Sequence, residues 1–306
     1  MLTVVALGGN ALLRRGEPLD AALQRANVKV AAEAVAEIAR DHQIVLTHGN
    51  GPQVGLLSLQ NEAYKEVAAY PLDVLDAETE GMVGYLLEQE LGRHIGRNKL
   101  ATLLTQVIVD PDDPAFSNPT KFVGPVYDAR DARFIAHERG WAVAPDGNHW
   151  RRVVPSPQPR AIVEIDTIRL LVTSGITVIC SGGGGIPVVI DATSGLKGVE
   201  AVIDKDLSAA LLAIELGAEA LILLTDVDAV YADWGTVGQR AVHETTSAQL
   251  RAMRLPAGSM GPKVEALCRF VESGGQLGAI GSLEDAADLM RGRAGTIVRG
   301  ASGRSS

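Results

Sequence analysis

The sequence predicts an α/β fold, with helices covering both faces of a mainly parallel sheet. Along the 306 residues, apolar β-branched runs of strand length alternate with alanine-rich stretches of helical spacing. Four of the expected strands are followed directly by segments rich in Gly or Asp, and in such sheets ligands bind beyond the carboxyl ends of the strands. We therefore expect these segments to converge on one edge of the sheet: residues 8–10, 47–51, 181–185 and 225–228.

The first third of the chain is expected to alternate between strands and helices. A helix over residues 20–40 is indicated by apolar residues at helical spacing, with Asp20 as its N-cap. The expected elements are, in order, strand 3–7, helix 20–40, strand 44–46, helix 54–66, and strand segments at 101–104 and 107–109.

Residues 111–160 differ in composition from the rest of the chain, because prolines interrupt the alternation of strands and helices and polar residues dominate. Such a stretch inside a compact enzyme is a linker, a small subdomain or a lid, and we favour a small subdomain or lid. Its aromatic residues could build a small core of their own: Phe116, Phe122, Tyr127, Phe134, Trp141 and Trp150.

The last part of the chain repeats the alternation of strands and helices. We expect the final residues, 302–306, to be a frayed tail. The elements expected before it are strand 176–180, helix 206–216, strand 221–224, helix 263–272, and strands near 277–280 and 296–298.

Composition narrows the class of protein. The hydrophobic content of 46% and charged content of 21% are ordinary for a globular protein, and no apolar run approaches the length of about 20 residues that a membrane span needs. The formal net charge of −9 argues against nucleic acid or a membrane surface as a partner.

The first residues look like a strand and not a signal peptide, and the two cysteines, Cys180 and Cys268, have no metal-type spacing. We expect a cytoplasmic protein with both thiols buried.

Three glycine turns are candidates for anion binding, because bare glycines let backbone N–H groups approach a ligand closely. Gly8-Gly9-Asn10 follows a strand, although a tight turn without a ligand explains it equally well. Gly49-Asn50-Gly51 is usual in a hairpin, but the residues that follow look helical; the preceding His48 receives no chemical role. Ser181 and four glycines after it suggest close passage of a ligand, with a flexible loop as the alternative.

Three lysines are candidates for chemistry. Lys205 stands beside Asp206 between an apolar run and a helix, and Lys121 lies in the proline-rich segment. Any single lysine is usually solvated surface. Lys263, however, occupies a helix start beside glycines, where the helix dipole disfavours a cation unless it faces an anion.

Several common catalytic motifs are missing from the sequence. There is no G-x-x-x-x-G-K-[ST], no intact G-x-G-x-x-G, no H-E-x-x-H, no G-x-S-x-G and no zinc-type cysteine pair. Metalloprotease, serine hydrolase and zinc-site interpretations therefore fail, and a nicotinamide dehydrogenase is disfavoured.

Several strings, in order along nearly the whole chain, resemble the amino acid kinase superfamily and, within it, the carbamate kinases. The short glycine turns are shared across the superfamily, whereas NPTK at 118–121 and WRRVVPSP at 150–157 are more particular to carbamate kinases. The other matching strings are VVALGGNAL at 4–12, HGNGPQVG at 48–55, LTQV at 104–107, residues 182–189, GVEAVIDKD at 198–206 and GSMGPK at 258–263.

The resemblance implies a single domain over residues 1–306, an open αβα sandwich from which a subdomain or lid at 111–160 protrudes. It implies that the N-terminal half binds the substrate and residues 176–300 bind the nucleotide. It implies reversible phosphoryl transfer between ATP/ADP and carbamate/carbamoyl phosphate, with Mg²⁺ held mainly by the nucleotide phosphates, in a homodimer.

The resemblance also implies roles for individual residues. Many members carry a lysine where Leu7 stands, so Lys121 would take over that task and the subdomain would move. The implied catalytic residues are Lys121, Lys205, Asp206 and Lys263. The implied substrate-binding residues are Gly8, Gly9, Asn10, Gly49, Asn50, Gly51, Gly183 and Gly184. The implied nucleotide-binding residues are Thr225, Asp226, Val227, Tyr231, Met260 and Lys263. The chain departs from the family pattern at residues 232–235, near the expected adenine site, and at Phe122-Val123.

Two other interpretations stay open at this point. One is a sister kinase acting on another small anion, and the other is a catalytically silent nucleotide sensor. Retention of all four candidate catalytic residues favours an active enzyme. The sequence decides neither the physiological direction nor the pathway, whether arginine breakdown or purine and allantoin degradation.

Overall fold

The computed structural model describes residues 1–13, 17–18, 20–64, 66–193, 195–253, 255 and 260–300, without the side chains of Asn10 and Ala11. The tail expected at residues 302–306 therefore lies outside the described residues, as does the side chain of Asn10.

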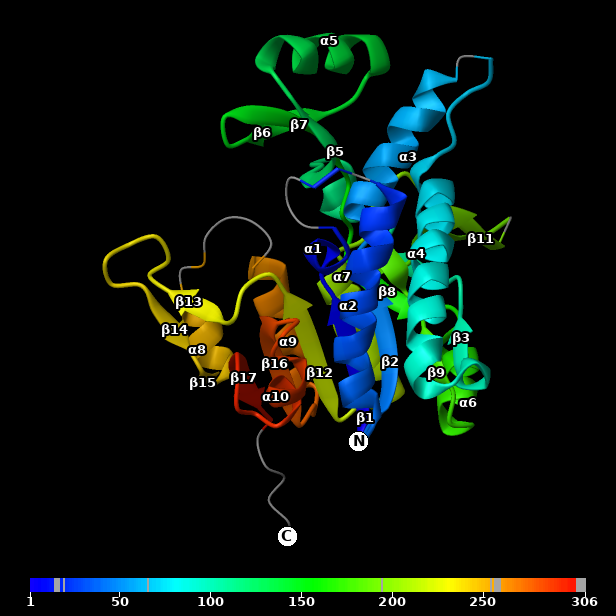
Figure 1. The fold of residues 1–306 in the computed structure, drawn as a ribbon. Coiled ribbons are helices and arrows are strands. Elements are labelled where there is room, and N and C mark those ends of the chain that lie inside the picture. The colour runs from blue at the N-terminus through cyan, green and yellow to red at the C-terminus, as the bar shows by residue number, and fades with distance from the viewer. Residues whose placement is uncertain are drawn as a thin grey trace.

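The central sheet has eight strands, in the order β15-β17-β16-β12-β1-β2-β9-β3 (Figure 1). Every neighbouring pair is parallel except β16 and β17, which run antiparallel. The prediction of a mainly parallel sheet is confirmed. The strands are β1 (Leu2–Leu7), β2 (Gln43–His48), β3 (Leu100–Thr102), β9 (Thr177–Ile179), β12 (Ala220–Thr225), β15 (Glu244–Thr245), β16 (Leu277–Ser282) and β17 (Thr296–Arg299).

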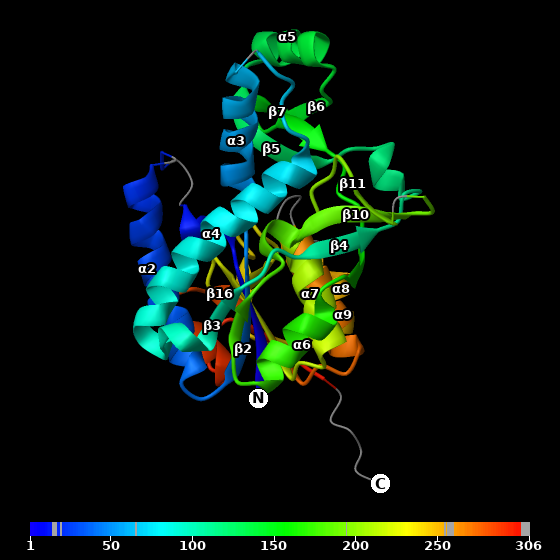
Figure 2. The ribbon, with the colours of Figure 1, turned by 90° about the vertical axis from the view of Figure 1, so that its right-hand side faces the viewer.

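Helices cover both faces of this sheet, which gives the expected αβα sandwich (Figures 1 and 2). Side chains alternate along β1: Val4 and Ala6 enter one core, and Val5 and Leu7 enter the other. The first core packs against α6 (Ile165–Thr173), α7 (Lys205–Leu216), α8 (Ser247–Ala252) and α9 (Met260–Glu272); the second packs against α2 (Ala21–Ala39), α4 (Leu72–Ile95) and α10 (Ala286–Met290).

The starts of the helices follow local sequence signals. The Asp20 side chain accepts hydrogen bonds from the amides of Ala22 and Leu23, so the predicted N-cap of α2 is confirmed. Helix α3 (Gly51–Ala63) begins three residues before the predicted start, because Pro52 fits a first helical turn. Helix α7 begins directly after Asp204, whose side chain caps it. A four-residue helix, α1 (Gly9–Leu12), follows β1.

Two smaller sheets lie beside the main one. The segment expected as strand 107–109 is β4 (Gln106–Val109), but it belongs to a separate sheet of order β11-β10-β4-β8. The reason is that β10 (Ile186–Asp191) pairs with it, Ile186 opposite Gln106. The remaining members are β8 (Pro159–Ile162) and β11 (Gly195–Gly198), and the other small sheet joins β13 (Val230–Ala232) to β14 (Arg240–Val242).

A three-stranded sheet with one helix stands off from the sandwich at the top of Figures 1 and 2. It follows the short helix η2 (Pro114–Phe116) and consists of β5 (Lys121–Tyr127), α5 (Ala129–Arg139), β6 (Val143–Asp146) and β7 (His149–Val154). We call β5, α5, β6 and β7 the lid.

The aromatic core expected for this region is wrong, since none of the six aromatic side chains is buried. Phe134 is 65% exposed. Arginine stacking takes the place of ring packing: the guanidinium of Arg152 lies 3.9 Å from the Trp141 ring centroid, and that of Arg151 lies 5.5 Å from the Phe122 ring centroid. The same guanidinium groups also reach polar partners: that of Arg151 donates to the Gly124 carbonyl, and that of Arg152 donates to the Ser58 hydroxyl.

The lid packs against α3 through a close approach of two backbones. A Cβ atom on Gly55 would lie 2.6 Å from the Cα atom of Gly124 in β5, so glycine is required on α3 at this point. Arg152 of β7 also donates from Nη1 to the Ser58 hydroxyl at 3.2 Å, and Arg139 of α5 pairs with Glu62. The lid is therefore attached to the helix that begins at the Gly49-Asn50-Gly51 turn.

Replacing Gly55 by alanine should push β5 away from α3. We expect Gly55→Ala to lower the free energy of unfolding by about 1–3 kcal/mol, the usual cost of overpacking. Gly81→Ala in α4 is the matched control, because its new Cβ would meet only the Leu104 side chain, at an ordinary 3.9 Å. Urea denaturation of both variants measures the effect, and equal stability of the two would contradict the close approach.

Candidate active site

The structure brings three of the four predicted segments into direct contact at the carboxyl edge of β12, β1, β2 and β9. A Cβ atom on Gly49 would lie 2.8 Å from the amide nitrogen of Gly9. A Cβ atom on Gly183 would lie 2.1 Å from the Asn50 side-chain nitrogen. The fourth segment, residues 225–228, continues from β12, where the Gly8 amide donates to the Leu224 carbonyl at 2.8 Å. The expected convergence on one edge is therefore observed.

Backbone amides at these turns face the carboxyl edge of the sheet. Helix α3 has no side-chain cap at its N-terminus, and Pro52 supplies no N–H there. In the turn after β9, the Gly182 amide donates to the Glu80 carboxyl group. The Gly184 and Gly185 amides donate to the carbonyls of Ser181 and Gly182, respectively. Within the described part of the chain, no hydrogen bond is made by the Gly183 amide. Amides at a helix start or a glycine turn are suitable donors for an anion.

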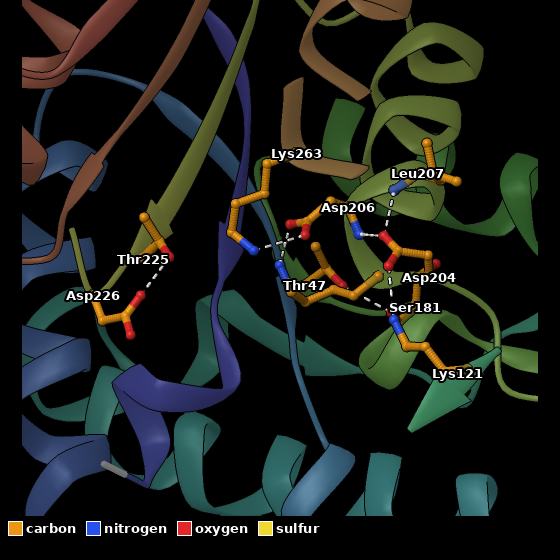
Figure 3. Close-up of polar contacts among 10 residues, drawn as sticks. Thr47, Lys121, Ser181, Asp204, Asp206, Leu207, Thr225, Asp226 and Lys263 are labelled. Atoms are coloured by element: carbon orange, nitrogen blue, oxygen red, sulfur yellow. Dashed lines mark hydrogen bonds and ion pairs between the residues drawn. The ribbon is translucent and has the colours of Figure 1, made fainter. Parts of the chain in front are cut away.

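Two of the predicted lysines share one buried aspartate, Asp206. Figure 3 shows its contact with Lys263. Asp206 lies in the first turn of α7, and its Oδ1 accepts a hydrogen bond from the Lys205 ammonium group. Its Oδ2 accepts a hydrogen bond from Nζ of Lys263 in α9, at 3.0 Å. Burial would raise the pKa of Asp206, but the two ammonium groups hold it well below its usual range. Burial also lowers the pKa of Lys205, an effect that Asp206 opposes. The carboxylate therefore keeps two cations together in a buried place.

Lys121 reaches the same place from the lid. Its ammonium group lies 2.7 Å from Asp204 Oδ2 (Figure 3), while Asp204 Oδ1 caps α7. Asp204 was not predicted as a site residue, although its position just before a helix identifies it as an N-cap candidate. Among themselves, these three lysines and two aspartates leave one net positive charge.

Helix α4 contributes two buried carboxyl groups that sequence analysis missed. Asp76 accepts from the Asn50 side chain at 3.3 Å, and Glu80 accepts from the backbone amides of Gly182 at 2.7 Å and Thr105 at 3.0 Å. Burial raises the pKa of Asp76 well above its usual range and that of Glu80 to about 8, against the effect of these hydrogen bonds. The one signal in the sequence is their spacing, which places both on the buried face of an amphipathic helix.

His48 is a packing residue in this arrangement. It is fully buried, and burial lowers its pKa to about 4, so the ring is neutral at pH 7. A Cβ atom on Gly182 would lie 2.4 Å from the imidazole, which therefore lies directly against the turn.

The residues implied for the nucleotide follow β12 and begin α9. The Thr225 hydroxyl donates to Asp226 at 3.0 Å, Val227 is half-buried, and Met260 is the first described residue of α9. Tyr231 donates to Asp228 at 2.8 Å, and its ring lies edge-to-face with Trp234 at 5.4 Å.

A groove of about 540 Å³ lies at the opposite edge of the sheet, where the strands begin. Its walls include Arg40, His42, His94 and Lys99, and none of the predicted site residues lines it.

Comparisons with known proteins agree with this fold and site. Residues 1–282 match the amino acid kinase family. A carbamate kinase of Rhizobium meliloti is 57% identical over 97% of this chain and 93% of its own length, and one of Haemophilus influenzae is 52% identical over 97% and 96%. The structure of a carbamate kinase from Giardia lamblia bound to AMP-PNP superimposes with a TM-score of 0.89, at 39% identity and 98% coverage of both chains.

The chain belongs to the amino acid kinase family. Within that family its similarity is to carbamate kinases, and it is accordingly a kinase, an enzyme that transfers a phosphoryl group. The resemblance that the sequence strings suggested is thereby confirmed.

The ionisation of Glu80 should make stability depend on pH. In the unfolded chain this carboxyl ionises near pH 4.5, whereas the folded protein retains the proton up to about pH 8. Its contribution to stability is therefore complete below pH 4.5 and is lost as the pH rises through 8. We expect the advantage of the wild type over Glu80→Gln to shrink by on the order of a few kcal/mol between pH 5 and 8. Urea denaturation at both pH values measures this, and a constant difference would contradict it.

Proposed function

We propose that this kinase transfers a phosphoryl group reversibly between ATP/ADP and carbamate/carbamoyl phosphate. The observation that carries the proposal is a charged cluster beside the glycine turns at the carboxyl edge of the sheet. It joins Lys121, Lys205 and Lys263 to Asp204 and Asp206, and every member except Lys121 is buried. The identity of its relatives, carbamate kinases over nearly their full length, supports the choice of substrate.

In the proposed reaction, an oxygen of the ADP β-phosphate attacks the phosphorus of carbamoyl phosphate. A new P–O bond forms to ADP, and the bond from phosphorus to the carbamate oxygen breaks, so that carbamate leaves as an anion and ATP results. No proton transfer and no covalent enzyme intermediate are needed. All three participants are anionic, so catalysis consists of alignment and charge neutralisation.

Each part of the site has a task in this scheme. The turns of Gly8, Gly9 and Asn10, of Gly49, Asn50 and Gly51, and of Gly183 and Gly184 would hold the carbamoyl group and phosphate. Thr225, Asp226, Val227, Tyr231 and Met260 would hold the nucleotide. Lys121, Lys205 and Lys263 would neutralise the transferred phosphoryl group, with Asp206 fixing the last two.

Lys121 would have to exchange partners during the reaction. It is paired with Asp204 in the structure, so its turn toward the phosphoryl group would break that 2.7 Å ion pair. We propose that the lid, together with the rest of residues 111–160, moves relative to the substrate-binding first half and the nucleotide-binding second half.

Mg²⁺ is the metal proposed for the reaction. In the parts of the chain that the structure describes, no three His, Cys, Asp or Glu side chains are grouped to hold an ion. We propose that the cation is held mainly by the nucleotide phosphates, as Mg²⁺ often is in kinases. When bound, Mg²⁺ would offset phosphate charge, and the lysines would act on the remainder.

ATP formation from ADP, Mg²⁺ and carbamoyl phosphate, coupled to an ATP-consuming reporter, tests the proposed function. We expect Lys263→Ala and Lys121→Ala each to lower kcat/KM by about 100-fold or more, because each removes a positive charge aimed at the transition state. Lys29→Ala is the control, since Lys29 is exposed on α2. A wild-type protein that binds ADP but forms no ATP would favour a sister kinase or a silent sensor.

We further propose a cytoplasmic homodimer that associates along β3. This short strand is an edge strand of the main sheet. Tyr85 of α4 and Leu104, which follows β3 in the chain, are both 54% exposed. Gly84 of α4 lies against Thr102 of β3, so helix and strand form one surface.

The two cysteines are free and buried, which suits a reducing compartment. Among the described helices, none has the length and apolarity to cross a membrane.

Sedimentation velocity tests the dimer. We expect a mass about twice the 32.2 kDa of one chain, and a shift toward one chain for Tyr85→Asp, because a charge there would be desolvated in the interface. Tyr64→Asp is the control, since Tyr64 is equally exposed, at 57%, but lies at the end of α3. A wild-type monomer would overturn the assignment.

A further inference from the structure

Glu80 is a buried carboxyl group that the proposed reaction does not use. It is 1% exposed, and within the described residues burial, hydrogen bonds and a neighbouring carboxylate, but no cation, influence its ionisation. Both carboxyl oxygens face backbone amides instead, Oε1 that of Gly182 and Oε2 that of Thr105. Burying a carboxyl group without a cation is costly, so its presence at this place calls for a specific task.

The two amides belong to segments that meet around Ser181. The Ser181 amide donates to the Thr105 hydroxyl at 2.9 Å, and the Thr47 hydroxyl donates to the Ser181 carbonyl at 2.8 Å. Glu80 therefore closes a ring of contacts around the start of the turn. Through Thr105 it fixes the residue that holds Ser181, and directly it fixes Gly182.

The turn itself has an unusual backbone that needs such support. Ser181 has a φ of 51°, a left-handed conformation that costs free energy in a residue with a side chain. Gly183, Gly184 and Gly185 also have positive φ angles, of 70°, 115° and 85°. Four consecutive glycines alone would not keep this geometry, because glycine is conformationally permissive.

We propose that Glu80 is a positioning residue that holds the Ser181–Gly185 turn so that its unpaired amide, that of Gly183, stays available to the substrate. The inference rests on the proposed function, in which Gly183 and Gly184 bind carbamoyl phosphate. Glu80 acts through the turn and does not itself contact the reacting atoms.

A carboxyl group suits this position better than an amide. Each of its oxygens can accept from an N–H group even when the carboxyl is protonated, because the hydroxyl oxygen keeps acceptor capacity, whereas the NH2 group of a glutamine only donates and would leave one N–H without a partner. Burial also raises the pKa of Glu80 to about 8, so near neutral pH the group is largely uncharged and repels an anionic substrate little. The neighbouring His48 is neutral at the same pH.

Steady-state kinetics of Glu80→Gln tests the role. We expect the KM for carbamoyl phosphate to rise about tenfold, since an unpaired buried N–H costs enough to displace the turn. The KM for ADP should stay unchanged, because the nucleotide is bound by other segments. Glu90→Gln is the matched control: Glu90 is a buried glutamate of the same helix, 2% exposed, that pairs with Arg93 and does not touch the turn. It should leave both KM values unchanged.

Hydrogen exchange provides a readout that does not depend on activity. Amides of the peptide covering residues 181–185 should exchange faster in Glu80→Gln than in the wild type, and at the wild-type rate in Glu90→Gln. If Glu80→Gln does not fold, Thr105→Val replaces it, because it removes the hydroxyl that holds Ser181 while keeping the shape of the side chain. The same rise in KM and in exchange is expected there.

The outcomes separate the inference from the proposed function. A wild type that forms no ATP overturns the function, while faster exchange in Glu80→Gln still supports the positioning role. An active wild type with unchanged KM values and unchanged exchange in the folded variant overturns the inference. Equal changes in the KM for ADP and for carbamoyl phosphate also overturn it, because they indicate a general loss of structure.

Discussion

The arrangement of the site depends on Asp206 lying between Lys205 and Lys263. Two ammonium groups that share a buried place repel one another, and each loses its hydration there. The carboxylate offsets both penalties and comes from the capped first turn of α7, so its position is fixed by the backbone. Asp204 pairs with Lys121 through Oδ2, the carboxyl oxygen that does not cap α7. The cluster is thereby stable before a ligand arrives, and it keeps one net positive charge that an anionic ligand can use.

Much of the fold followed from the sequence because it depends on local patterns. Alternating strands and helices imply parallel strands, and parallel strands bring their carboxyl ends together, so the convergence of the glycine turns could be predicted without any coordinates. Helix α2 and its cap at Asp20 were equally local. The candidate lysines could be singled out by their neighbours, Asp206 for Lys205 and the glycines before Lys263, although each alone resembled a surface lysine.

What escaped prediction depends on contacts between distant segments. Glu80 and Asp76 look like ordinary polar positions of a helix until Gly182, Thr105 and Asn50 are brought against them by the sheet. Strand β4 left the main sheet because β10, some 80 residues later, pairs with it. The lid has no aromatic core; arginine guanidinium groups stack on two of its rings, Trp141 and Phe122, and such stacking is not visible in spacing along a strand. Residue type and spacing show which groups are present, whereas pairing across the fold decides what they do.

The junction between Gly55 and Gly124 has a consequence for how this protein can diverge. The lid meets α3 at a close approach of two glycines, flanked by the polar pairs of Arg139 and Arg152 with α3 and by a small apolar cluster that joins Val123 and Val154 to Val54. A graft that kept these contacts and Lys121 could exchange the rest of the outer surface of the lid, while the sandwich and its buried charges stayed as they are. The chain therefore separates into a part that evolution or design can vary for a new acceptor and a part where change is penalised, and the boundary runs through two residues that carry no functional group.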